Sequence, residues 1–215
     1  MNNENIKYND AYLKVISSNK TEKNRLDALI DEYSAKEVPT KEDVIKLLNI
    51  SLVDEYLAEF NYYASYNLSK TDGKSDYDPE FQQHEEDERD HRKQITDRLR
   101  ELGAPVPTPQ LINFCNENSN GLNWKQETSS SSNDILLNRY NEELNAVKFY
   151  GMIFSVLRKL PNEIRDTTTE MLIKKIKADE ETHAKDLKDL LIEHGILEDS
   201  LMPMSDNSQV EDENE

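Results

Sequence analysis

The sequence HEEDERDH, residues 84–91, decides the fold because it contains the pair Glu88-x-x-His91. The same pair recurs as Glu180-x-x-His183. A spacing of three residues brings a carboxylate and an imidazole to neighbouring points on one helix face, where both can bind a single ion. One such pair in a chain rich in Glu would arise by chance on a solvated charged face. Two pairs instead predict half or more of a two-metal site in a helical bundle.

Four long segments with helical periodicity carry these pairs. The first begins where Thr40 and Asp43 can form a capping box, and the second ends at Gly103, a typical helix stop. Asn133 or Asp134 is predicted to cap the third helix. The stretch between the second and third helices holds prolines and a serine run, so it is predicted to cross the length of the bundle. The apolar spacing therefore predicts helices at about 40–68, 80–102, 133–160 and 162–194.

The composition bounds the class of protein. The 215 residues suit one domain with a core, and 5 Gly with 7 Pro favour long helices over short strands and turns. The 44 acidic and 26 basic side chains give a net charge of -18, which argues against binding nucleic acid and favours cations as partners. Cys115 is the only cysteine, which excludes an internal disulfide and fits a reducing cytoplasm. No signal peptide or membrane-length apolar run is seen, so a soluble protein with no membrane partner is expected.

Composition also divides the chain into three parts. Residues 1–39 are polar, with amphipathic stretches at about 8–16 and 25–33, and are predicted to form an N-terminal helical extension. Residues 40–195 form the predicted bundle. Residues 196–215 are acidic and are predicted to be a disordered tail.

The two remaining helices repeat a second motif. Glu55 is followed by Ala after three residues and by Tyr62 after seven, and Glu143 is followed in the same way by Ala and Tyr150. Seven residues are nearly two helical turns, so each Glu shares a stripe with its Ala and Tyr. A carboxylate on a buried stripe needs a positive partner, which a metal supplies. The stripes therefore predict one Glu ligand from each of these helices.

Two alternatives stay open on these stripes. Glu59 has Tyr66 seven residues later but lacks the intermediate Ala, so Glu55 is preferred as the ligand from the first helix. Tyr62 and Tyr150 either are ordinary core aromatics or donate hydrogen bonds to ligand carboxylates. Six acidic residues flank the two Glu-x-x-His pairs, namely Glu85, Glu86, Asp87, Asp90, Asp179 and Glu181. Most of them are predicted to be solvated, and some are predicted to line a route for cations.

The ligand types indicate the metal. Four carboxylates and two imidazoles suit iron, or alternatively manganese, better than zinc, whose structural sites favour thiolates. Bridging Glu side chains can hold two ions together and leave coordination positions open for an oxidant.

These motifs resemble the ferritin-like di-iron proteins, and within them the Dps-like branch of thermostable ferritin-like proteins. The resemblance covers about residues 41–194 and rests on five stretches, which are residues 54–63, 84–91, 98–105, 143–150 and 179–183. It implies an all-α ferritin-like four-helix bundle with a long crossover between its second and third helices. It also implies that the metal ligands, which carry the catalysis inside each subunit, are Glu55, Glu88, His91, Glu143, Glu180 and His183.

The resemblance further implies a function. Members of this branch assemble as hollow cages, oxidise ferrous iron preferentially with hydrogen peroxide and store the ferric mineral. By this likeness the chain is expected to be a homo-oligomer, with a dodecameric cage as one form, that protects against oxidative stress. The branch often has a cysteine pair near the site, whereas here Leu144 and Asn145 follow Glu143.

The leading functional expectation is a di-iron ferroxidase with two irons per subunit and peroxide or dioxygen as oxidant. A rubrerythrin-like peroxidase is the enzymatic alternative, although the chain lacks the Cys-x-x-Cys pairs of a rubredoxin domain. A metal-bearing structural or assembly protein without turnover is the alternative from another class.

Overall fold

The structure, a computed structural model, describes residues 22–71, 75–104 and 131–197. Most of the predicted crossover, the first amphipathic stretch and nearly all of the acidic tail lie outside these residues. The described residues hold helices and no strand. In chain order the elements are α2 (Glu22–Ser34), α3 (Lys41–Thr71), the short 3₁₀ helix η1 (Ser75–Tyr77), α4 (Asp78–Glu101), α7 (Ser132–Lys159) and α8 (Thr167–Glu193).

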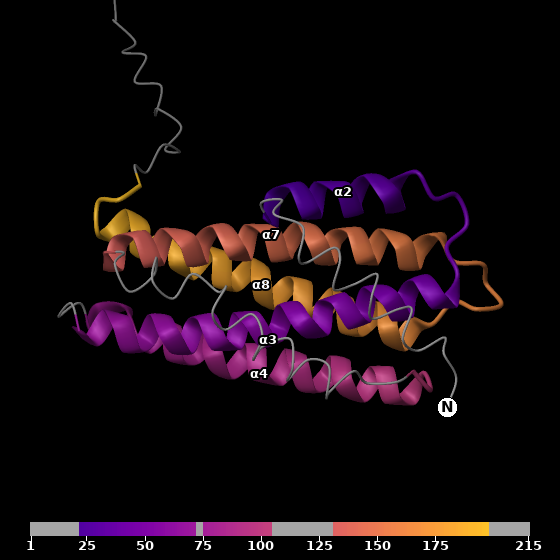
Figure 1. The fold of residues 1–215 in the computed structure, drawn as a ribbon, viewed down its shortest axis with the longest axis horizontal. Helices are drawn as coiled ribbons and strands as arrows, with labels where there is room; N and C mark the ends of the chain where they lie inside the picture. The colour runs from indigo at the N-terminus through magenta and orange to yellow at the C-terminus, as the bar shows by residue number, and fades with distance from the viewer. Residues whose placement is uncertain (1–21, 72–74, 105–130, 198–215) are drawn as a thin grey trace, which may run out of the picture.

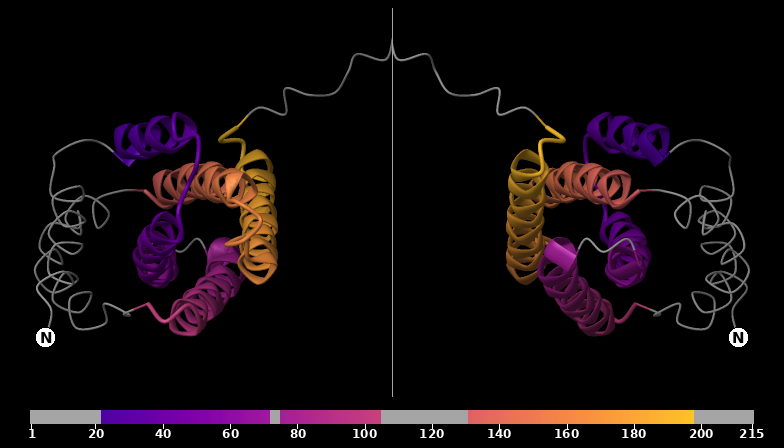
Figure 2. Two further views of the ribbon diagram at one scale, coloured as in Figure 1. Left: turned by 90° about the vertical axis from the view of Figure 1, so that its right-hand side faces the viewer. Right: turned by 90° about the vertical axis from the view of Figure 1, so that its left-hand side faces the viewer.

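Four of these helices form a bundle, which confirms the predicted all-α architecture. The helix α3 packs antiparallel along α4, and α7 packs antiparallel along α8 (Figure 1). Seen along the bundle, α3, α4, α8 and α7 follow one another around a shared interior, with α2 on the outside against α7 (Figure 2). Because α4 and α7 run in the same direction, the end of α4 and the start of α7 lie at opposite ends of the bundle (Figure 1).

Local chemistry fixes where α3, α4 and α8 begin and end. The capping box predicted for α3 is confirmed, because Thr40 N donates to Asp43 Oδ2 at 2.8 Å and Asp43 N donates to Thr40 Oγ1 at 3.3 Å. Gly103 and Gly195 follow α4 and α8 with φ of +73° and +68°, the left-handed conformation that glycine adopts without strain.

Two predicted helix starts are wrong by a few residues. Ser131, not Asn133 or Asp134, caps α7, and its hydroxyl accepts from Asp134 N at 3.2 Å while Asp134 Oδ2 accepts from Ser131 N at 3.2 Å. The helix α8 begins at Thr167 rather than near Asn162. Asp166 occupies the N-cap position of α8. Its carboxylate accepts hydrogen bonds from backbone amide groups of the first turn, which have no partner within the helix.

The interior has three layers along the bundle. One apolar cluster includes Leu47, Ile95 and Ile176, and a second at the other end includes Phe81 and Leu187. Along α4 and α8 the residues between these clusters are acidic and imidazole side chains that are also buried. Each buried Leu or Ile contributes roughly 1.5–3 kcal/mol, so the two apolar layers can stabilise the polar layer held between them.

The helix α2 adds to one apolar layer. Leu26, Leu29 and Tyr33 belong to the first cluster, and Tyr33 is almost fully buried. Lys159 at the end of α7 donates to the backbone oxygen of Ser34 at 3.1 Å, which ties the end of α2 to the bundle. None of the described helices has a stretch both apolar and long enough to cross a membrane.

Candidate metal centre

The buried polar layer contains all six side chains that the sequence predicted as ligands. They come from four helices, and none is more than 3 % exposed. They are Glu55 from α3, Glu88 and His91 from α4, Glu143 from α7, and Glu180 and His183 from α8.

These six side chains form two overlapping groups. In each group every residue offers one ligand atom within 4.8 Å of the ligand atoms of the others. Glu88 and Glu180 belong to both groups, the first of which adds Glu55 and His91, and the second Glu143 and His183. The arrangement is that of two neighbouring cation positions that share two carboxylates.

The shared carboxylates face both positions. His91 Nδ1 lies 3.2 Å from Glu88 Oε2 and 3.2 Å from Glu180 Oε1. His183 Nδ1 lies 3.4 Å from Glu88 Oε1 and 3.3 Å from Glu180 Oε2. Each shared Glu therefore offers one oxygen to each position, which is the geometry of a carboxylate that bridges two ions.

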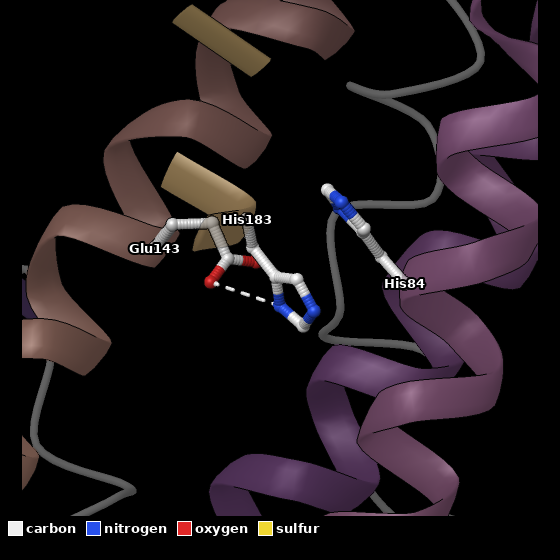
Figure 3. A group of neighbouring side chains, drawn as sticks. All are labelled: His84, Glu143 and His183. Atoms are coloured by element: carbon white, nitrogen blue, oxygen red, sulfur yellow. Dashed lines mark ion pairs between the residues drawn. The ribbon is translucent and has the colours of Figure 1, made fainter. Parts of the chain in front are cut away.

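The two outer carboxylates complete one position each. Glu55 Oε2 lies 3.4 Å from His91 Nδ1, and Glu143 Oε2 lies 3.8 Å from His183 Nδ1. Figure 3 shows Glu143 and His183 approaching each other from α7 and α8. The two halves of the bundle thus supply matching sets of ligands.

Several atoms at the centre of the layer form ion pairs with one another but make no hydrogen bond of normal geometry. Glu55 Oε2, Glu143 Oε2, Glu180 Oε2 and His183 Nδ1 are buried and have no hydrogen-bond partner. Buried polar atoms are normally hydrogen-bonded, and an unpaired buried carboxylate is costly. Two divalent cations carry a charge that balances four carboxylates, so the residues present fit a two-ion site.

Burial and mutual repulsion shift the pKa values of the outer carboxylates. Burial, followed by repulsion from Glu88, raises the pKa of Glu55 well above its ordinary value. Burial, followed by repulsion from Glu180, raises the pKa of Glu143 in the same way. In the metal-free chain both shifts favour the protonated forms of these two carboxyl groups.

The remaining pKa shifts follow from close contacts. Burial raises the pKa of Glu88, but the close contacts with the imidazoles of His183 and His91 outweigh burial and hold that pKa below its ordinary value. Burial lowers the pKa values of both imidazoles, but contacts with carboxylates outweigh burial and raise these pKa values well above the ordinary value. The largest of these contacts is with Glu180 for His91 and with Glu143 for His183. The metal-free imidazoles are therefore protonated at neutral pH.

Metal binding is expected to release protons. The raised pKa values of Glu143 and His183 favour their protonated forms, and a cation must displace those protons before it can bind. Affinity for divalent ions should then increase as the pH rises. Calorimetric titration with Mn²⁺ in two buffers of different ionisation enthalpy should give clearly different heats. Equal heats in both buffers would contradict this assignment.

Asp87 and Asp179 orient the two imidazoles, a role that sequence reasoning missed. His91 Nε2 lies 3.1 Å from Asp179 Oδ2, and His183 Nε2 lies 3.3 Å from Asp87 Oδ2. Each Asp directly precedes the Glu of one motif and contacts the His of the other. An imidazole that donates through Nε2 keeps the Nδ1 lone pair for a metal. The signal available in the sequence was Asp-Glu-x-x-His, present in both motifs.

Replacing these Asp residues tests that role. Asp87→Asn and Asp179→Asn should each weaken Mn²⁺ or Fe²⁺ binding by about 10- to 100-fold, because an amide no longer enforces the required tautomer. Both side chains are more than a third exposed, so the fold should tolerate the change. The neighbouring Asp90→Asn on exposed α4 surface is the matched control, and a similar loss there would contradict the assignment.

Tyr62 and Tyr150 contact the outer carboxylates across the bundle. The hydroxyl of Tyr62 on α3 donates to Glu143 Oε1 on α7, and the hydroxyl of Tyr150 on α7 donates to Glu55 Oε1 on α3. Burial, together with the nearby carboxylates, raises both tyrosine pKa values well above the ordinary value, so both remain donors. Each Tyr therefore holds one oxygen of a Glu and leaves the other oxygen directed at the centre.

The alternative Glu on α3 has a different environment. Glu59 pairs with Arg89 at 2.9 Å and with Arg92 at 2.7 Å on the bundle surface. Glu55 lies in the buried layer instead. The structure therefore brings Glu55, and not Glu59, together with the other five residues.

A cavity reaches the polar layer from the outside of α3 and α7. It has a volume of about 130 Å³ and extends from Glu55 and Glu143 past Ala58 and Ala146. Leu26 and Leu29 of α2 line its outer part. Its lining also includes Glu88 and Glu180, so the cavity reaches the carboxylates of the polar layer.

His84 joins the layer without belonging to a Glu-x-x-His motif. It is 1 % exposed and stacks on His183 with ring centroids 4.1 Å apart. Figure 3 shows it reaching from α4 toward the pair formed by Glu143 and His183. Burial is the main reason that its pKa falls to about 3, so this imidazole is neutral. The signal in the sequence was its position seven residues before His91, on the same stripe of α4.

Comparison with known proteins identifies the fold. No protein-family model and no curated protein matches the chain. Among solved structures it is similar to a dodecameric thioferritin, the bacterioferritin-related protein from Bacteroides fragilis, with a TM-score of 0.58. The two chains are 23% identical, and the match covers 82% of this chain and 99% of the other. The similarity shows a ferritin-like fold, as the sequence predicted.

Proposed function

We propose that the protein is a ferroxidase that binds two ferrous ions as substrate in the polar layer and oxidises them. The observation that carries this proposal is the pair of bridging carboxylates, Glu88 and Glu180, each of which directs one oxygen at each cation position. Carboxylates and imidazoles with little sulfur suit Fe²⁺, and the high density of negative charge favours the ferric product. Manganese fits the same ligands and is the alternative ion. The reducing cytoplasm, where ferrous iron persists, is the proposed compartment.

Hydrogen peroxide is the proposed oxidant, and one peroxide accepts the two electrons that two ferrous ions supply. Each ferrous ion gives up one electron, the O–O bond of one peroxide breaks, and uptake of two protons yields two waters. Dioxygen is the alternative oxidant, and two ferrous ions then reduce it to hydrogen peroxide. The protonated carboxyl groups and imidazoles of the metal-free site do not serve as the proton source, because the ions displace those protons on binding.

The cavity between α3 and α7 supports access of a small neutral oxidant. Its lining includes the small side chains of Ala58 and Ala146 and all four carboxylates of the polar layer, Glu55, Glu88, Glu143 and Glu180. The imidazoles His91 and His183 instead direct Nε2 toward α8 and α4 residues.

We further propose that the ferric product is stored in an assembly of several chains. The similar thioferritin is dodecameric, and this chain carries exposed apolar side chains that a partner subunit could cover. Tyr63 is 52% exposed and Phe60 37% on α3, and Leu144 is 36% exposed on the adjacent α7. Oxidised iron held within a closed shell would account for protection against oxidative stress.

Repeated iron additions test the proposal. The full-length protein is mixed with ferrous iron in small portions, each followed by hydrogen peroxide, and ferric absorbance is recorded. A ferroxidase that stores iron should oxidise each portion far faster than buffer does and keep the ferric iron with the protein through gel filtration. Oxidation at the rate seen in buffer would rule out the ferroxidase. Fast oxidation followed by loss of all iron on the column would rule out storage but not the ferroxidase activity.

A further inference from the structure

A buried imidazole outside the proposed di-iron site lacks a normal partner. His84 is 1 % exposed, and its Nδ1 has no hydrogen-bond partner. Its contacts are with rings, because it stacks on His183 and meets the Tyr62 ring edge-on with centroids 5.0 Å apart. A buried position on this stripe of α4 would ordinarily hold an apolar side chain. A buried polar ring is expected to have a ligand or a hydrogen bond.

The outer edge of His84 faces two carboxylates. His84 Nε2 lies 4.0 Å from Glu80 Oε2, one helical turn earlier on α4. Glu80, His84 and Asp186 each offer a ligand atom within 4.8 Å of the others. Glu80 and Asp186 are partly exposed whereas His84 is buried, so the three residues reach from solvent into the bundle.

The same imidazole also belongs to an inner group. His84, Glu143 and His183 have ligand atoms within 4.8 Å of one another (Figure 3). Glu143 and His183 belong to the second of the two cation positions described above. Among the described residues, His84 alone belongs both to the group with the outer carboxylates and to a group with residues of that inner position.

We propose that Glu80, His84 and Asp186 form a third cation site that binds ferrous iron and passes it to the position held by Glu143 and His183. Two carboxylates and one imidazole are a ligand set that suits Fe²⁺ and leaves positions open for water. Partly exposed carboxylates attract cations and exchange them readily, while the buried imidazole gives the site its preference for transition metals. The role in iron transfer rests on the proposed ferroxidase function, whereas the binding of a third ion does not.

Counting bound cobalt tests the site without any oxidation. The full-length protein is dialysed to equilibrium against Co²⁺ with excess Mg²⁺, which suppresses binding to isolated surface carboxylates. Wild type should hold three Co²⁺ per chain. The variant Glu80→Gln with Asp186→Asn should hold two, and both changes lie at partly exposed positions that folding tolerates.

A control variant separates the site from general surface charge. Asp97→Asn with Asp189→Asn removes the same charge from the same two helices at positions 56% and 60% exposed, and it should still hold three ions. Two ions in wild type, or three in the Glu80→Gln and Asp186→Asn variant, would overturn the proposal. Loss of the third ion in the control variant would also overturn the proposal, because it would show that net surface charge, and not this site, holds the third ion.

The rate of loading tests the transfer step. Co²⁺ entering the inner positions changes the visible spectrum, which stopped-flow mixing can follow. Removal of Glu80 and Asp186 carboxylates should slow this loading by about tenfold, the lower end of electrostatic steering effects, while the final inner occupancy stays at two. An unchanged rate would overturn the transfer role. Because cobalt is not oxidised here, a failure of the ferroxidase proposal would appear in iron oxidation and not in these measurements.

Discussion

Glu180→Gln is expected to lower the rate of iron oxidation by more than about a hundredfold. Glu180 directs one oxygen at each cation position, so its replacement weakens both positions at once. Side chains that only orient metal ligands contribute about 10- to 100-fold, and a bridging ligand should exceed that. Glutamine has nearly the same shape, so the loss would come from charge and ligand strength rather than from packing. The measurement is the initial rate of ferric absorbance after peroxide is added to ferrous-loaded protein.

The adjacent residue provides the control for this prediction. Glu181 is 53% exposed and pairs with Lys177 on the surface of α8. Glu181→Gln removes the same charge one residue away and should leave the oxidation rate within about twofold, since exposed ion pairs contribute little. Equal rates for Glu180→Gln and wild type would contradict the bridging assignment. Equal losses in both variants would show that overall charge, and not the site, sets the rate.

Metal loading is expected to raise the melting temperature strongly. The metal-free chain keeps a layer of buried carboxyl and imidazole groups, several of whose atoms have no partner. An ion at about one hundred times its Kd stabilises the folded state by about 2.7 kcal/mol for each site. For a chain of this length that corresponds to about 5–10 °C per site. Thermal unfolding followed by circular dichroism with and without Mn²⁺ measures the shift.

A variant without the outer carboxylates separates metal binding from folding. Burial and the neighbouring carboxylates raise the pKa values of Glu55 and Glu143, which favours their neutral forms in the metal-free chain. Glu55→Gln with Glu143→Gln should therefore melt within a few degrees of the metal-free wild type and gain much less from Mn²⁺. A gain equal to that of wild type would contradict the assignment of these two residues as ligands.

The six clustered side chains could be predicted because each motif lies within one helix. A spacing of three or seven residues fixes which side chains share a helix face, whatever the tertiary structure. Glu55 and Glu143 were found from the repeated Ala and Tyr on their stripes. Burial in one common layer then required only that four helices pack with these stripes facing inward.

Contacts between helices could not be predicted in this way. The bond between Asp87 and His183 joins different helices, so its existence depends on the relative height and rotation of the packed helices. For Tyr62 a bond to a ligand carboxylate was one of two expectations, but its partner on α7, Glu143, depends on the same packing. Charge alone made Asp87 look like an ordinary surface residue. The start of α8 was also misplaced, because the Asp166 cap stops the helix from extending back toward Asn162.

The outer parts of the site depend on tertiary packing as well. His84 shares a stripe with His91, but its nearness to Glu80 and Asp186 becomes visible only when α4 and α8 are packed together. Similarly, the predicted N-terminal extension gave no indication that Leu26 and Leu29 would line the outer part of the cavity. Sequence patterns thus located the six clustered side chains, whereas the residues that surround them depend on packing.

Anaerobic loading with ferrous iron, followed by titration with hydrogen peroxide, tests the central claim most directly. The protein is loaded with excess Fe²⁺, desalted, counted for iron, and titrated while ferric absorbance is recorded. The account predicts that the inner site retains two ferrous ions and that one peroxide oxidises both of them, with no radical products trapped. Retained iron that peroxide oxidises no faster than free iron in buffer, or one iron oxidised per peroxide, would contradict it.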